Sequence, residues 1–185
     1  MVDVIYKDSK DKMEKVNANL KQELSRLRTG RATPALLDGI KVEYYGSLTP
    51  INQVANISVP DPKLIVIQPW DHNAIAAIEK GIIKSDLGLN PQSDGKVVRV
   101  PIPALTDERR KDLVKLVKKL GEDSKVTVRN IRRQANDSIK AEEKKKSIGE
   151  DESKKGQEQV QKFTDEYIAQ IDKILEAKEK EIMQG

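Results

Sequence analysis

The sequence VTVRNIRRQAND, residues 126–137, combines an apolar side with three arginines in five positions. Apolar residues continue before and after this stretch at steps of three and four, the spacing of one face of an α-helix. Arg129, Arg132 and Arg133 fall outside that face. The predicted apolar face consists of Leu113, Val117, Leu120, Ser124, Val128, Ile131, Ala135 and Ile139. The stretch therefore predicts the middle of one long helix in a bundle, with an arginine-bearing edge.

The charge of this helix is concentrated. Residues 106–146, its full predicted extent, contain 14 Lys and Arg against 8 Asp and Glu, a net charge of +6, whereas the whole chain carries only +4. Charge runs on surface helices are commonly solvated faces. The choice of arginine favours a phosphate ligand, because a guanidinium is a planar fork of donors that binds phosphate through two hydrogen bonds. Residues 147–185 have 6 basic and 10 acidic side chains, so we expect a bundle with one basic and one acidic edge.

The composition narrows the class of protein. Hydrophobic residues make up 37% of the 185 residues and aromatic residues 3%, which favours extended helices with narrow apolar seams over one large core. The absence of cysteine excludes disulfides, thiolate zinc sites and cysteine nucleophiles. No apolar stretch approaches the roughly 20 residues of a membrane span, and no signal peptide opens the chain. We therefore expect a soluble, cytoplasmic protein.

The chain alternates between helical and mixed parts. Residues 3–28 hold apolar residues at helical spacing and contain no Pro or Gly. The sequence from Gly30 to Pro34 ends this helix, since Gly suits the position after a helix and Pro disfavours helix in the residue before it. Thr106 is predicted to cap the second helix and Glu150 to open the third. Three long amphipathic helices joined by short turns predict a bundle.

Residues 30–105 form a neutral segment with 7 basic and 7 acidic side chains. Alternating apolar residues predict strands, and Asp71 or Asn73 can cap a short helix. The predicted strands are residues 40–45, 54–59, 64–67 and 97–102, with turns at 60–62 and 93–95, and the helix bears Ile75, Ile78, Ile82 and Ile83. We therefore predict a bundle domain of residues 1–29 and 106–185 and a mixed α and β domain inserted between them.

Candidates for catalysis are few. His72 is the only histidine, and although Asp71 lies beside it, no nucleophile motif accompanies the pair. No glycine-rich phosphate loop of the Walker or dinucleotide kind is present. Trp70 and Tyr45 could stack on bases, but aromatic residues in so small a domain are more often core, and we assign neither of them a role. The sequence predicts no enzyme, no metal site and no cofactor.

Five segments carry a resemblance to a known family. They are LRTGRATPALLDGI at residues 27–40, VEYYG at 42–46, SDLGLNP at 85–91, TDERRKDL at 106–113 and VRNIRR at 128–133. In this order the chain closely resembles the bacterial ribosome recycling factor (ribosome-releasing factor) family over nearly its whole length.

The resemblance implies an α+β fold, in which an elongated three-helix bundle carries a small β/α/β domain inserted after the first helix, giving an L-shaped protein with a two-stranded hinge. It also implies binding to large-subunit ribosomal RNA of the post-termination ribosome, in the tRNA-binding region. Elongation factor G, which itself binds the GTP, would then drive splitting of the ribosome into subunits. The implied protein is a monomer that requires neither a cofactor nor a membrane.

The resemblance assigns roles to individual residues as well. The family's RNA-contacting arginines correspond to Arg110, Arg129, Arg132 and Arg133, with Arg28 and Arg31 near the bundle end and the hinge. The implied hinge residues are Gly30, Pro34, Pro101, Pro103 and Leu105. The arginines at 129, 132 and 133 coincide with the basic edge that the helical pattern predicts without the resemblance.

Two other classes of protein remain open from the residues alone. A general RNA-binding or architectural protein would use the same arginines and need no elongation factor. A coiled-coil chaperone or scaffold would pair its helices between chains and form a dimer. An enzyme is the least favoured class, since a nucleophile, a metal cluster and a cofactor loop are all missing from the sequence pattern.

Overall fold

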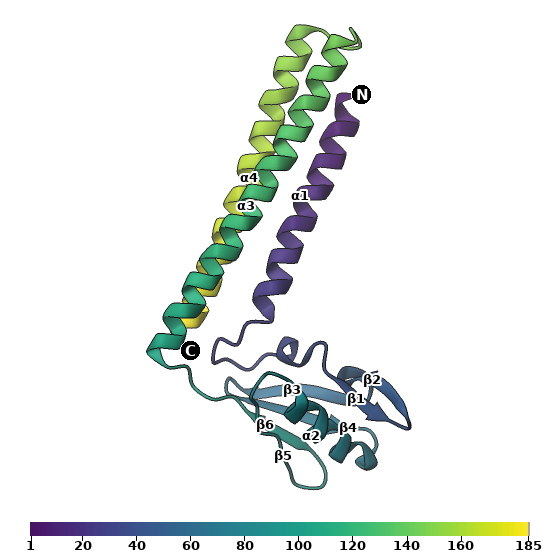
Figure 1. The fold of residues 1–185 in the computed structure, drawn as a ribbon, viewed down its shortest axis with the longest axis vertical. Helices are drawn as coiled ribbons and strands as arrows, with labels where there is room; N and C mark the ends of the chain where they lie inside the picture. The colour runs from purple at the N-terminus through teal and green to yellow at the C-terminus, as the bar shows by residue number, and fades with distance from the viewer. Residues whose placement is uncertain (185) are drawn as a thin grey trace. The chain divides into compact units, whose positions relative to one another are not determined.

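Three long helices run alongside one another in the first of two structural units (Figure 1). The computed structural model of this protein describes residues 1–184. This unit comprises Met1–Leu24 and Lys111–Lys180. The helices are α1 (Val2–Ser25), α3 (Asp107–Lys144) and α4 (Glu150–Gln184). Together with the strands of the second unit they confirm the predicted α+β class and the three-helix bundle.

The helix ends follow local capping chemistry. Thr106 caps α3 as predicted, because its Oγ1 accepts a hydrogen bond from the backbone N–H of Arg109 at 3.2 Å. Lys146 closes the other end in a left-handed conformation, with a φ of 58°, and its N–H donates to the carbonyl of Glu143 at 2.9 Å. The first helix ends at Ser25, three residues before its predicted end.

The apolar face of α3 is buried much as the sequence predicts, with one residue that the pattern missed. Leu120 and Ser124 are only half-buried, whereas Gly121 is buried. A Cβ atom on Gly121 would overlap Cδ1 of Leu175 on α4 and lie 2.7 Å from its Cδ2. The two helices therefore approach closely at a position where α3 has no side chain. The buried residues of α3 are Leu113, Val117, Gly121, Val128, Ile131, Ala135 and Ile139.

The second unit, formed by Ser25–Arg110 and the end of α4 from Glu181, contains an antiparallel sheet. Its strand order is β3-β4-β6-β5, and a separate hairpin consists of β1 and β2. The elements are η1 (Pro34–Leu37), β1 (Lys41–Tyr44), β2 (Ser47–Pro50), η2 (Ile51–Gln53), β3 (Ala55–Asp61), β4 (Leu64–Pro69), η3 (His72–Ala74), α2 (Ile75–Lys84), β5 (Gln92–Ser93) and β6 (Val98–Pro101).

The four-stranded sheet buries one face and exposes the other. Side chains alternate across a strand, so neighbouring residues of β4 and β6 point to opposite faces. On one face Ile65, Ile67, Val98 and Val100 join a core with Ile75, Ile78 and Ile82 of α2. On the other face Asn56, Ser58, Gln68 and Arg99 are exposed. The open face thus presents polar side chains beside the end of β4.

Several local predictions in this unit were wrong. Pro60 does not end the strand, because a bulge between Ser58 and Asp61 omits it from the ladder, which resumes at the pair Asp61–Leu64. Ser93, predicted as a turn, pairs with Val98. Of the four isoleucines predicted on the short helix, Ile83 is 65% exposed.

Candidate nucleic-acid interface

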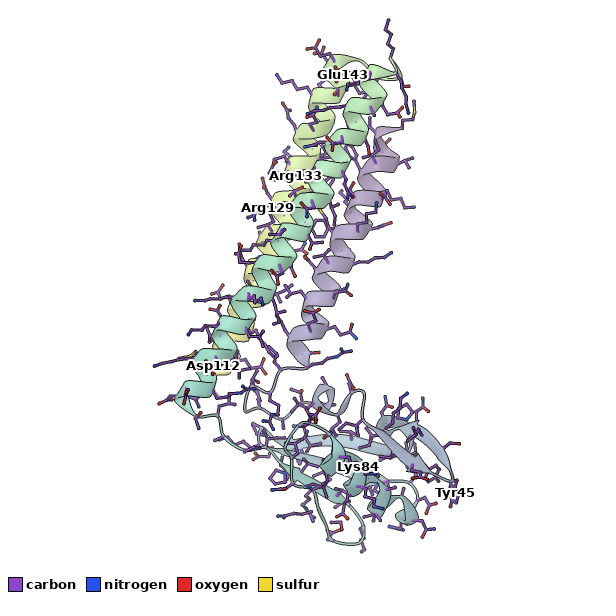
Figure 2. All side chains as sticks on the ribbon, viewed as in Figure 1. Tyr45, Lys84, Asp112, Arg129, Arg133 and Glu143 are labelled. Carbon is purple, nitrogen blue, oxygen red and sulfur yellow. The ribbon has the colours of Figure 1, made fainter. Side chains whose placement is uncertain are left out.

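Two arginines one helical turn apart form the centre of the candidate interface. Arg129 and Arg133 are exposed on α3, and Figure 2 labels them one after the other along that helix. Val128 and Ile131 in the same stretch are buried. A helix that buries these two positions turns residues 129 and 133 outward, because side chains four residues apart share a face. The predicted exposure of the two arginines is confirmed.

The two arginines belong to a longer line of cations, which we call the basic row. Its members recur at steps of three, four, seven and eleven residues, so they follow one side of α3. All are exposed, and none forms an ion pair with any residue in the described range 1–184. Glu122 is the one acid that the spacing places within it. The basic row consists of Lys111, Lys115, Lys118, Arg129, Arg133 and Lys140.

Arg132 lies at the border between α3 and α4. It is half-buried, and its Nη1 donates a hydrogen bond to Oε1 of Gln161 on α4 at 3.2 Å. Gln161 in turn donates from Nε2 to Oδ1 of Asp165 at 2.8 Å. A guanidinium has five N–H donors. This contact therefore holds the side chain in place while leaving most of its donors for a ligand.

Lys125, one heptad before Arg132, has a different environment. Its Nζ lies 2.6 Å from Oδ1 of Asp172 and 3.5 Å from Oε1 of Glu122. The hydrogen bond that the Lys125 ammonium group donates to Asp172 is the main cause of its raised pKa. Its charge is already matched within the bundle, so Lys125 is not part of the basic row.

The other three predicted arginines lie in the second unit. Arg31 is exposed, and Arg28 is half-buried near Gly88, where an added Cβ would lie 3.4 Å from its Nη1. Arg110 is in the first turn of α3, and its buried Nε has no hydrogen-bond partner among the described residues. The structure thus brings Arg129, Arg132 and Arg133 together on one helix and places Arg28, Arg31 and Arg110 in the other unit.

The predicted hinge residues occupy two kinds of position. Pro34 opens η1, and Pro101 ends β6, where it pairs with Leu64, so both are parts of the insert. Gly30 has a φ of +76°, and a Cβ there would lie 3.2 Å from Cγ of Leu105. Gly30 and Leu105 are therefore in close approach where the two connecting segments run. Pro103 is exposed between Ile102 and Leu105.

Two backbone hydrogen bonds mark where the insert begins and ends. The N–H of Ala32 donates to the carbonyl of Pro62 at 2.6 Å, and the N–H of Ile102 donates to that of Lys63 at 2.8 Å. Both connecting segments are thus attached to the same turn between β3 and β4. Among the described residues, no such backbone bond is made by residues 26–31 or 103–106, although Thr29 donates a hydrogen bond from Oγ1 to Oε1 of Glu181 at 2.9 Å.

The structure corrects the prediction for two aromatic residues. Trp70 is 70% exposed and Tyr45 is 77% exposed, so neither belongs to the core. Tyr45 lies in the two-residue turn between β1 and β2, and Figure 2 shows it at the tip of that hairpin. His72 is exposed in η3. Within residues 1–184, no cluster of His, Cys, Asp or Glu is arranged to hold a metal ion, and no helix is long and apolar enough to cross a membrane.

Sequence reasoning missed Gln161 and the lysines of the basic row. The lysines could have been found by extending the helical spacing of Arg129 and Arg133 in both directions. Gln161 gave no signal of its own, because its role depends on which side of α4 faces α3.

Comparison with known proteins decides the family. The family model for ribosome recycling factor matches residues 20–183. The chain belongs to the ribosome recycling factor family. It is 56% identical over 181 residues to the ribosome-recycling factor of Natranaerobius thermophilus, covering 98% of both chains. It is 58% identical over 179 residues to that of Nitratidesulfovibrio vulgaris, covering 97% of this chain and 96% of the relative.

Solved structures of the family share the fold. A solution structure of the ribosome recycling factor matches with a TM-score of 0.80 and 49% identity, covering 100% of this chain and 98% of that one. A second match, with a TM-score of 0.69 and 48% identity over 98% of both chains, comes from models of the T. thermophilus ribosome recycling factor and E. coli elongation factor G bound to the E. coli post-termination complex. Family membership makes this protein a translation factor.

Proposed function

We propose that this protein binds the post-termination ribosome in the tRNA-binding region of the large subunit and, with elongation factor G and GTP, splits it into subunits for a new round of initiation. Two observations support the proposal. The chain belongs to the ribosome recycling factor family, and the T. thermophilus relative is described together with elongation factor G on a post-termination complex. In this proposal the protein acts as a monomer in the cytoplasm.

The proposed RNA-binding step rests on the basic row of α3, whose positive charges are not neutralised by ion pairs within the described residues. Six exposed cations without ion-pair partners in the described range lie along one side of a helix that is otherwise packed against its neighbours. Ribosomal RNA presents phosphates along an extended surface, and cations that neutralise them release condensed counterions. We assign Arg132 to the same surface, with its guanidinium oriented by Gln161. Arg28, Arg31 and Arg110 would add contacts from the second unit.

The proposed splitting step is mechanical. In this proposal the free energy comes from GTP bound by elongation factor G. The bundle holds ribosomal RNA while the elongation factor pushes the inserted domain. The connecting segments at residues 26–31 and 103–106 would take up the change in backbone angles, since the bonds at Ala32 and Ile102 attach the chain to the insert beyond them.

Light scattering tests this function directly. Purified post-termination ribosomes are mixed with this protein, an active cognate elongation factor G and GTP, and each component is then omitted in turn. We expect a fall in scattering only when all components are present, because subunits scatter less than whole ribosomes. Ribosome binding without any fall in scattering would favour a general RNA-binding protein. A dimer of this protein in solution would favour a scaffold with helices paired between chains.

A further inference from the structure

Trp70 borders a hollow in the inserted domain that the proposed splitting function does not use. It follows β4, is the only tryptophan of the chain, and exposes 70% of its surface. The hollow has a volume of about 570 Å³, within the range of small-molecule sites, roughly 300–1,000 Å³. Its lining consists of Asn56, Gln68, Pro69, Trp70, His72 and Lys96.

The backbone on both sides of the indole is fixed. The N–H of Trp70 donates to the carbonyl of Val54 at 3.2 Å. Asp71, the next residue, accepts from the N–H of Asn73 at 2.9 Å through Oδ1 and from the hydroxyl of Tyr45 at 2.7 Å through Oδ2. These bonds hold the pKa of the Asp71 carboxyl below its usual range, and the bond from the backbone N–H of Asn73 contributes most. The exposed ring therefore sits on a preorganised segment, which lowers the entropy cost of binding.

The remaining side chains around the hollow complement a nucleotide. Asn56 and Gln68 are directly opposite one another on β3 and β4, and each carboxamide both donates and accepts hydrogen bonds, as the edges of bases do. Lys96 is exposed and has no ion pair within the described residues. The nearby carboxylate of Asp94 is already bonded to Nη1 of Arg99 at 2.7 Å. The hollow thus combines an aromatic face, two amides and one free cation.

We infer that this hollow binds an unpaired base of single-stranded RNA, with the indole of Trp70 stacked on the base and Lys96 lying against an adjoining phosphate. Sequence-tolerant RNA binding elsewhere uses the same combination of aromatic faces and cations. If the occupant were instead an anchoring side chain of a protein partner, a mostly apolar pocket would be expected. Apart from Trp70 and Pro69, the lining here is polar. The site is separate from the basic row on α3 and adds a second RNA contact.

The single tryptophan gives a selective test. We would record the indole N–H signal of the ¹⁵N-labelled full chain by NMR while adding single-stranded RNA hexamers up to millimolar concentration, with an RNA duplex of the same sequence as the control. We expect a saturable shift of the Trp70 indole signal and of the Asn56 and Gln68 side-chain amides with single strands only. Lys96→Ala should weaken this binding and reduce its dependence on salt. No shift of the indole signal at any concentration would overturn the inference.

Ribosome affinity supplies a second readout. We expect Trp70→Ala to weaken binding to post-termination ribosomes by about 5- to 100-fold, the range of base stacking on an aromatic ring, and Trp70→Phe to retain most of the affinity. Ile83→Ala, which removes an equally exposed apolar side chain from α2 in the same domain, is the matched control. Affinity unchanged in Trp70→Ala would overturn the inference. A loss of affinity without any response to RNA would also overturn it, because it would point to a ribosomal protein as the partner.

Discussion

The Nη1 atom of Arg132 lies 3.2 Å from Oε1 of Gln161, so α4 orients a guanidinium that belongs to α3. Gln161 is itself held by Asp165 at 2.8 Å, and this second bond fixes which end of its carboxamide faces the arginine. Arg129 and Arg133 are exposed, and no side-chain hydrogen bond holds either of them within residues 1–184. The arginine edge therefore combines one side chain positioned by a hydrogen bond with two exposed ones, and the contributions of the three residues can be separated by substitution.

Replacing Arg132 with alanine should weaken ribosome binding by about 10- to 100-fold, the range for losing a hydrogen-bonded contact to a charged group. The slope of log affinity against log salt should also decrease by about one, because one fewer phosphate is neutralised. Arg132→Lys should keep the slope and lose part of the affinity, since the charge remains but the planar fork is gone. Filter binding of ribosomes over a salt series measures both. Equal affinity at every salt concentration would exclude Arg132 from the interface.

Removing the hydrogen bond between Arg132 and Gln161 should change ribosome binding in a different way from removing Arg132 itself. In Gln161→Ala all cations remain, so we expect an unchanged salt slope and a fall in affinity of about 2- to 10-fold from the extra cost of ordering a free arginine. Gln161→Glu should lower both affinity and slope, because a carboxylate would neutralise Arg132. Gln159→Ala, at an exposed position on the same helix, is the control. A steeper or shallower slope in Gln161→Ala would contradict a purely positioning role.

The sequence predicted the helices well because each is fixed by local chemistry. Thr106 caps α3, and the apolar steps through Val128 and Ile131 keep their period over the whole helix. What failed depends on tertiary placement. Composition cannot tell an aromatic residue in a core from one on a rim, so Trp70 and Tyr45 were misplaced. For the interface, the exposed arginines of α3 were predictable. The hydrogen bond between Arg132 and Gln161 was not, because it depends on where α4 lies against α3.

Gly121 is the residue at which the bundle should be most sensitive to added volume. Gly121→Ala would force Leu175 away from α3, and overpacking of this kind costs about 1–3 kcal/mol. Alanine is the better helix former by about 1 kcal/mol, so we expect the free energy of unfolding to fall by up to about 2 kcal/mol. Urea unfolding followed by circular dichroism measures the change.

Two further variants control for the glycine effect. Gly156→Ala on α4 would place its Cβ 3.3 Å from Cδ1 of Ile139 and 3.5 Å from the hydroxyl oxygen of Tyr6, without overlap, and should therefore lower stability less than Gly121→Ala. In a Leu175→Ala background, Gly121→Ala should cost less stability than it does in the parent, since the overlapping atoms are gone. If Gly121→Ala is as stable as the parent, the close packing of α3 and α4 at this position does not contribute to the free energy of unfolding.

Asp94 should make the stability of the inserted domain depend on pH. Backbone N–H groups of Val97 and Lys96 and the guanidinium of Arg99 hold the pKa of its carboxyl far below the usual range. A lowered pKa in the folded state stabilises the protein above the unfolded value, about 4, and this stabilisation is lost as the pH falls below it. Asp94→Asn should therefore lower stability at pH 7, and its difference from the parent should shrink below pH 4.

Thermal unfolding of parent and variant between pH 3 and pH 7 measures this convergence. Asp86→Asn removes an exposed carboxylate from the same unit that has no hydrogen bond or ion pair among the described residues, so it serves as the control. A difference between parent and Asp94→Asn that stays constant down to pH 3 would show that the carboxylate charge does not stabilise the fold.

Locking the connecting segments should separate ribosome binding from ribosome splitting. A Cβ on Gly30 would lie 3.2 Å from Cγ of Leu105, so the pair Gly30→Cys and Leu105→Cys places two thiols close enough to bridge. The chain has no other cysteine, so this would be its only disulfide. We expect the oxidised variant to bind ribosomes at a near-normal affinity and to lose the fall in light scattering, because the segments can no longer change their angles. The reduced form of the same variant is its control, since it carries the same strain at Gly30 without the cross-link. Full splitting by the oxidised form would mean that the proposed movement at these segments is unnecessary.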